Sequence, residues 1–188
     1  MGFNREKIIQ GARLMLEGMG EDPGREGLLR TPERIAEYFE EVLAGMHQDP
    51  AVELRKYTTK NKDEMIILKD ISFFSLCEHH LLPFFGKVHI AYIPQTDMMV
   101  GFSNMVRVVE ILSRRLQVQE RMTSQIADSI IEAVQPKGVL IVVEAEHLCL
   151  TMRGLKKPGS KIVTSAIRGM MRRAPTRAEA LSLIERQG

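Results

Sequence analysis

The first sixty residues follow a helical pattern of apolar and polar positions. In residues 4–19 apolar side chains recur every three or four positions, and Asn4 is suited to cap such a helix. A second helix is predicted from Thr31, with Pro32 at its first position and Gly45 as its stop. A polar stretch from Gln48 to Glu64 then ends the helical pattern. We therefore expect residues 1–64 to be an N-terminal helical segment and linker.

From Met65 onward the pattern changes to that of strands and helices in a mixed order. Short apolar runs at 65–68 and 71–76, and alternation through 86–94, predict three strands. Two helical patterns follow, the first capped by Ser103 and the second closed by residues 136–138. A continuous apolar run from Val139 predicts a central strand reaching Cys149, and residues 161–168 predict its partner. A capping box at Thr176 opens a last short helix. We expect an α+β body over 65–188, in the order β-β-β-α-α-β-β.

Charge and composition exclude several classes of function. The chain has 188 residues, 26 Lys and Arg against 24 Asp and Glu, and hence a net charge of +2. This field is too weak to indicate nucleic-acid binding, so any anion site must come from a local cluster. No apolar leader-like segment or long membrane-spanning run is present, and we expect a cytoplasmic protein without membrane partners.

The candidate chemistry lies between the predicted strands. Cys77 and His80 have the C-x2-H spacing at which a tight turn can direct sulfur and nitrogen to one metal ion. The other cysteine, Cys149, follows His147 by two positions, so both should face the same side of a strand. Three protein ligands would leave zinc an open position for water, whose pKa falls to about 7. His79 and His147 are then candidate proton carriers.

The same residues have simpler readings. Cys77 and Cys149 could form a disulfide or be ordinary buried thiols. A further alternative is a non-catalytic protein in which zinc or a disulfide only ties Cys77 to Cys149. The cluster of one cysteine and two histidines, together with a third histidine and a second cysteine elsewhere in the chain, favours a metal site. A site of two thiolates and one imidazole also accepts iron. His47 and His89 carry no such neighbours and are interpreted as structural.

Several segments together resemble a known enzyme family. They are Cys77–His80, Gly101–Ser103, Arg107–Glu110, Gln117–Arg121 and His147–Gly154. In this order they are similar to the signature segments of GTP cyclohydrolase I. The resemblance implies the tunnelling fold, in which antiparallel sheets with two helices on the outer face assemble into rings. It also implies a homo-oligomer, a decamer of two stacked pentameric rings with sites between subunits.

The resemblance assigns a role to each residue of the site. It makes Cys77, His80 and Cys149 the ligands of Zn²⁺. It implies GTP as substrate, with water activated at the metal attacking C8 of the purine and formate leaving. His147 would protonate N7 and His79 would help to move protons as the imidazole ring opens. The product would be 7,8-dihydroneopterin triphosphate, the first intermediate of folate or other pterin synthesis.

The remaining roles concern substrate binding. The resemblance makes Glu120 the carboxylate that accepts both donors of the guanine edge, with Gln119 alongside, and Ser103 the hydroxyl that contacts ribose. Three arginines match its phosphate-binding positions, namely Arg34, Arg107 and Arg153. Asn104 departs from the family, which commonly has a phosphate-binding lysine there. The loss of this cation should weaken triphosphate binding by about 1.5–3 kcal/mol, unless Lys87 or Lys156 compensates, and leaves open a related purine or pterin enzyme.

Overall fold

The computed structural model describes residues 2–54, 56–58, 64–95 and 98–186. Residues 55 and 59–63, which belong to the expected polar linker, lie outside the described residues. The chain divides into two compact units, residues 1–44 and 45–188. This division falls before the expected boundary after residue 64, because the segment that follows residue 44 packs with the body rather than forming a bare linker.

The N-terminal unit consists of two helices that pack against each other, α1 (Arg5–Gly18) and α2 (Thr31–Val42). The Asn4 side chain caps α1 by accepting a hydrogen bond of 2.9 Å from the Lys7 backbone N–H, as the sequence predicts. Helix α2 begins at Thr31 itself, so that Arg30 occupies the capping position and Thr31 is the first helical residue. This is a shift of one position from the prediction.

A five-stranded sheet in the order β5-β2-β3-β6-β7 forms the centre of the second unit. Its long strands pair antiparallel, and β5 pairs parallel to β2. The strands are β2 (Ile66–Cys77), β3 (Pro83–Ile93), β5 (Leu116–Gln117), β6 (Gly138–His147) and β7 (Lys161–Gly169). The α+β architecture predicted from the sequence is confirmed.

The two short strands predicted at 65–68 and 71–76 are one strand, which corrects the prediction. Strand β2 runs through a register shift between Leu68 and Ile71. At this β-bulge Asp70 has a left-handed φ of 62°, and its backbone N–H donates to Nδ1 of His89 on β3 at 3.1 Å. The bulge interrupts the apolar pattern without ending the strand.

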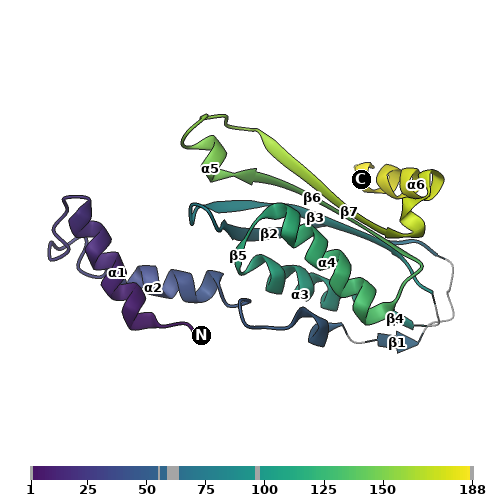
Figure 1. Ribbon diagram of the computed structural model, residues 1–188, viewed down its shortest axis with the longest axis horizontal. Coiled ribbons are helices and arrows are strands. Elements are labelled where there is room, and N and C mark those ends of the chain that lie inside the picture. The colour runs from purple at the N-terminus through teal and green to yellow at the C-terminus, as the bar shows by residue number, and fades with distance from the viewer. Residues whose placement is uncertain (1, 55, 59–63, 96–97, 187–188) are drawn as a thin grey trace. The chain divides into compact units, whose positions relative to one another are not determined.

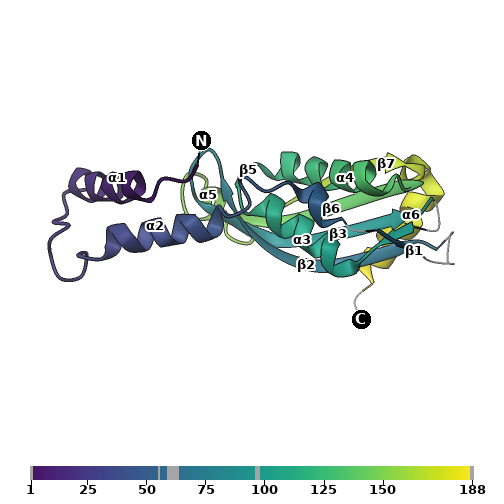
Figure 2. The same ribbon diagram turned by 90° about the horizontal axis from the view of Figure 1, so that it is seen from below.

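Two consecutive helices, α3 (Phe102–Ser113) and α4 (Gln119–Val134), cover one face of the sheet (Figure 1, Figure 2). Their apolar faces close the main core over side chains such as Val88, Ile90 and Ile141. The α6 helix (Ala174–Glu185) packs on Ala91 and Leu140, whose side chains alternate to the other face. The α3 helix is capped by Gly101, not by Ser103, and α6 begins before the predicted capping box at Thr176.

The smaller elements were not predicted. The 3-10 helix η1 (Pro50–Glu53) packs on α3, and β1 (Lys56–Thr58) pairs antiparallel with β4 (Met98–Val100). A second 3-10 helix, η2 (Met170–Arg172), precedes α6. The predicted central strand was expected to reach Cys149, but β6 ends at His147 and Cys149 lies in the short helix α5 (Leu148–Thr151). No helix among the described residues is long and apolar enough to cross a membrane.

Candidate functional site

Three potential metal ligands meet where β2 and β6 end. Cys77 is the last residue of β2, His80 lies in the turn that follows, and Cys149 lies in α5. One ligand atom from each residue lies within 4.8 Å of the other two. The Cys77 Sγ atom is 3.8 Å from His80 Nδ1, and both cysteines are free thiols. The structure therefore brings together the three ligands expected from the sequence and contains no disulfide between them.

Local hydrogen bonds explain why these residues converge. The backbone N–H groups of His80 and Leu81 donate to the Cys77 carbonyl at 3.3 and 2.8 Å, and Cys77 N–H donates to Leu82 O at 2.9 Å. Leu81 closes this turn with a left-handed φ of 53°. On the other side, β3 and β6 are paired as far as Phe84 and His147. This strand pairing thus places the start of α5 next to the turn that follows β2.

The donor set and its spacing fit a zinc ion. Bond lengths near 2.3 Å for sulfur and 2.0–2.1 Å for nitrogen at a tetrahedral centre place the two ligand atoms about 3.6 Å apart. The observed 3.8 Å separation of Cys77 Sγ and His80 Nδ1 is close to that value. Burial and then the neighbouring Cys77 raise the pKa of the Cys149 thiol. A cation bound between the two sulfurs would reverse this effect by favouring thiolate.

His79 lies beside the three ligands without belonging to them. Its Nδ1 atom is also 3.8 Å from Cys77 Sγ, but among the described residues it does not join the cluster that includes Cys149. The side chain is 64% exposed, and its Nε2 atom lies 4.0 Å from a carboxylate oxygen of Glu78. Arg121 of α4 binds the same carboxylate and lowers the pKa of Glu78. His79 therefore lies beside the cluster with most of its side chain open to solvent.

His147 is the buried imidazole of the site. Its ring stacks on Phe84, with centroids 4.6 Å apart and planes 6° from parallel. Its Nε2 atom lies 2.8 Å from Oε1 of Gln119, at the start of α4. Burial lowers the pKa of His147, and the nearby Glu120 carboxylate opposes this shift. The sequence offered no signal for the Phe84 contact, since it depends on the register of β3 and β6.

Both polar atoms of the Gln119 side chain form hydrogen bonds within the chain. The residue is 1% exposed, and its Nε2 group donates to Val143 O and Ile162 O at 3.0 Å each and to Thr164 Oγ1 at 3.1 Å. A contact between this side chain and guanine would require one of these bonds to be exchanged. Glu120, the next residue, is exposed in the first turn of α4.

The α3 helix carries two further candidates, and η1 provides their neighbours. The Arg107 guanidinium is 64% exposed and lies 3.9 Å from the Glu53 carboxylate. The Asn104 amide donates to the Glu53 carbonyl at 2.5 Å and accepts from the Ser103 hydroxyl at 3.3 Å. Arg107 thus keeps most of its surface for an anion, whereas the Asn104 amide is turned toward η1.

Arg153 and Arg34 are the two remaining candidates for phosphate binding. Arg153 is exposed just after α5, and its charge acts on Cys149 by lowering the thiol pKa against the larger effect of burial. Arg34 lies on α2 in the N-terminal unit. Its part in a phosphate site stays a prediction.

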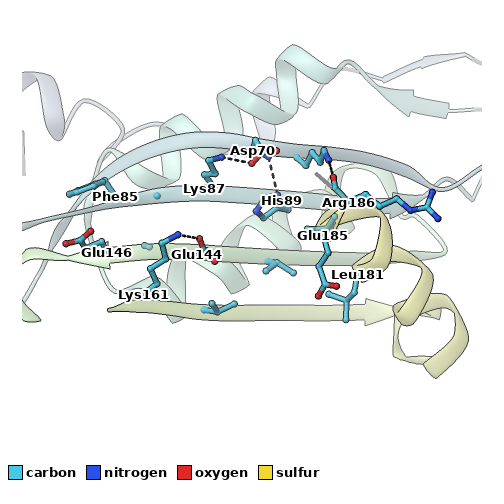
Figure 3. A pocket seen from close by; sticks show the side chains of 16 residues that line it. Asp70, Phe85, Lys87, His89, Glu144, Glu146, Lys161, Leu181, Glu185 and Arg186 are labelled. Carbon is cyan, nitrogen blue, oxygen red and sulfur yellow. Dashed lines mark hydrogen bonds and ion pairs between the residues drawn. The ribbon is translucent and has the colours of Figure 1, made fainter. Parts of the chain in front are cut away.

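A separate cavity of about 920 Å³ lies on the sheet face that carries α6 (Figure 3). Charged side chains on its wall pair with each other, Lys87 with Asp70 and Lys161 with Glu144, each at 2.7 Å. None of the three candidate metal ligands lines it. This cavity is therefore distinct from the metal cluster.

Comparisons with known proteins agree with the geometry of the site. The family model described as GTP cyclohydrolase I matches residues 8–185. The chain belongs to the GTP cyclohydrolase I family. "GTP cyclohydrolase 1" of Carboxydothermus hydrogenoformans is 55% identical over 98% of this chain and 96% of its own length. The proteins of that name from Pelotomaculum thermopropionicum and Bacillus subtilis are 54% and 51% identical, each over 98% of this chain and 99% and 97% of their lengths.

Family membership confirms the resemblance noted in the sequence, the tunnelling fold and the expected class of enzyme. The reading of the chain as a non-catalytic protein tied by a disulfide is not supported, because both thiols are free. A solved structure, "Crystal structure of the archaeosine synthase QueF-Like in the apo form", overlaps 58% of this chain and 97% of its own, at 16% identity and a TM-score of 0.44.

Proposed function

We propose that this member of the GTP cyclohydrolase I family opens the imidazole ring of GTP at C8. It would release formate and rearrange the ribose to give 7,8-dihydroneopterin triphosphate, the entry to folate and other pterins. The observation that carries the proposal is the cluster of Cys77, His80 and Cys149, whose ligand atoms lie within 4.8 Å of one another at the end of the strand that carries His147.

Zinc is the metal that this donor set fits best, since it combines two sulfurs with one imidazole and leaves a fourth position free. A zinc ion held here would act as a Lewis acid and bring the pKa of water at its open position to about 7. The side chains supply what remains, which is the binding of GTP, the orientation of its purine and the movement of protons.

The two other histidines suit different proton transfers. As water adds to C8, His147 would give a proton to N7, and the stacked Phe84 would keep its ring in one plane during the transfer. His79 is largely exposed and next to the cluster, so it would carry protons between the opening ring and solvent. A buried acid and an exposed carrier together complete the proton path.

Substrate binding would use groups from α3, α4 and the loop after α5. The Glu120 carboxylate would accept the guanine N1–H and 2-amino donors, which lie side by side. Arg107 and Arg153 would bind phosphate oxygens, and Ser103 would contact the ribose during its rearrangement. Because Asn104 provides no cation, we expect triphosphate affinity to depend strongly on Arg107 and Arg153.

We further propose a homo-oligomer of the family's type, two stacked rings of five chains with sites completed between subunits, in the cytoplasm. Strand β7 ends the sheet order, so one edge of its backbone has no strand partner within the described part of the chain. Such an edge is suited to pairing with another copy. Free thiols at the metal cluster suit a reducing compartment.

The direct test is incubation of the zinc-loaded protein with GTP. One formate per GTP, and a pterin that becomes fluorescent after oxidation, are expected for the wild type. His147→Ala with zinc still bound should form neither product at a comparable rate. Intact GTP with wild-type protein that is fully loaded with zinc would contradict the proposal. Turnover of guanosine in place of GTP would instead favour a related purine enzyme, the reading that Asn104 left open.

A further inference from the structure

The amide of Gln119 has an orientation that its surroundings determine. Two of the acceptors around its terminal nitrogen are the backbone carbonyls of Val143 and Ile162, each at 3.0 Å. Carbonyl oxygens cannot donate, so the atom facing them must be the NH2 group. The amide oxygen therefore faces His147 Nε2, at 2.8 Å. Since an amide oxygen only accepts, the proton of this bond belongs to His147.

Two threonines extend the same network and fix its direction. The Thr123 hydroxyl lies 2.7 Å from the Gln119 backbone carbonyl and must donate to it. In the 2.7 Å contact between the hydroxyls of Thr123 and Thr164, the donor is therefore Thr164. Thr164 in turn accepts from the Gln119 amide at 3.1 Å. The two N–H groups of the Gln119 amide are thus shared among three acceptors, and a flipped amide would place its oxygen against two carbonyls.

We propose that Gln119 is a positioning residue that holds neutral His147 as the tautomer with its proton on Nε2. Nδ1 is then the nitrogen that exchanges protons with the substrate. In the transfer to purine N7, the doubly protonated ring gives up its Nδ1 proton and becomes the neutral Nε2–H ring, which takes a proton back at Nδ1. This inference rests on the proposed function for the acid role of His147, but not for the tautomer.

The alternative role for Gln119 is a contact with guanine, and the burial of the side chain argues against it. The side chain is 1% exposed, its oxygen accepts from His147, and three acceptors share its two N–H groups, so the amide has no free group to offer a ligand. The neighbouring carboxylate of Glu120 is exposed and can bind guanine alone. The different roles of these adjacent residues follow from the burial of Gln119 and the exposure of Glu120.

The tautomer can be measured by ¹⁵N solid-state NMR of the zinc-loaded protein labelled at histidine, which does not depend on the size of an oligomer. The chain has five histidines, and the signals of His147 are assigned by their loss in His147→Ala. Wild-type protein at a pH where the ring is neutral should show Nε2 protonated and Nδ1 bare. The opposite assignment would overturn the inference without any variant at Gln119.

Kinetics of Gln119→Leu supply the second measurement. The leucine cannot accept from His147, so both tautomers should appear, and kcat should fall about tenfold or more, a part of what general acid catalysis contributes. The KM for GTP should stay within about twofold, because no substrate contact is lost. A raised KM with unchanged kcat would instead identify Gln119 as a guanine contact.

Thr164→Val is the matched control. It removes one acceptor of the Gln119 amide but leaves both backbone carbonyls, so Nε2 of His147 should stay protonated. If this variant mixed the tautomers as much as Gln119→Leu does, loosened packing rather than the amide would set the tautomer, and the inference would fail. A wild type with the expected tautomer but no formate release would leave the positioning intact and refute the proposed function.

Discussion

Two adjacent histidines can be distinguished by their effect on zinc binding. Both His79 and His80 have Nδ1 at 3.8 Å from Cys77 Sγ, but only His80 forms a cluster with Cys149. His80→Ala should therefore bind zinc much more weakly, because only the two sulfurs remain as ligands. His79→Ala should retain zinc while losing the proton carrier. The pair differs by one position in the same turn, so each variant controls for the disturbance caused by the other.

The expected size of the effect follows from linkage between binding and folding. At free zinc about 1,000-fold above Kd, binding adds about 4.1 kcal/mol to stability. If removing the His80 ligand weakens affinity by about 100-fold, at least as much as the loss of an outer-shell partner, the same zinc adds only about 1.4 kcal/mol. The difference of about 2.7 kcal/mol should lower Tm by about 5–11 °C in a chain of this length.

The assay combines zinc competition against a chromophoric chelator with thermal unfolding at one buffered concentration of free zinc. Metal-free samples of wild type and both variants should unfold at similar temperatures, so that the difference appears only with zinc. Loss of zinc by His79→Ala alone, or equal losses by both variants, would refute the assignment of Cys77, His80 and Cys149 as the ligand set.

Three further predictions concern recognition, pH and packing. Glu120→Gln should raise KM for GTP by about 10- to 150-fold, which corresponds to the loss of a charge-assisted hydrogen bond. It should also reduce the preference for GTP over inosine triphosphate, which lacks the 2-amino donor. An unchanged preference would exclude Glu120 as the guanine contact. Burial lowers the pKa of His89, labelled in Figure 3, below its ordinary 6.5. The unfolded chain therefore binds more protons below pH 6.5, and the free energy of unfolding, which is highest above pH 6.5 as far as His89 is concerned, should decline as the pH falls below that value. Denaturant unfolding of His89→Asn should show a smaller decline, and an equal decline would contradict this cause. Gly86→Ala should destabilise the protein by at least about 1–3 kcal/mol, because an added Cβ would lie 1.9 Å from the Glu144 carbonyl oxygen. Gly11→Ala should not destabilise it, because an added Cβ there would have nothing within 4 Å. Thermal unfolding of the two variants compares these effects.

The sequence predicts well what depends on local pattern. The spacing of Cys77 and His80 is a property of one turn, and it gave two ligands that the structure brings together. The helical periodicity likewise predicted α3 and α4 in their correct order. The helix that holds Cys149 was missed, because a helix of four residues, Leu148–Thr151, is too short to show a helical period in the sequence.

Features that depend on contacts between distant segments could not be predicted from pattern. The bulge at Asp70 appears in the sequence as a gap between two strands, and only pairing with β3 shows that the strand continues. The role of Gln119 depends on carbonyls of β6 and β7 that lie 24 and 43 positions away. From the sequence alone, a glutamine in the first turn of a helix is expected at the surface, because the strands that it contacts are not known.

The distance along the chain between Cys77 and Cys149 has a consequence for biogenesis. A nascent polypeptide that has left the ribosome only as far as α4 has one thiol and one imidazole of the cluster, and two donors retain zinc poorly. A metal ion would therefore be held by all three candidate ligands only after β6 has paired with β3 and brought Cys149 to the site. Metal loading would therefore be a late event during synthesis, and bound zinc would report that the central strands have already assembled.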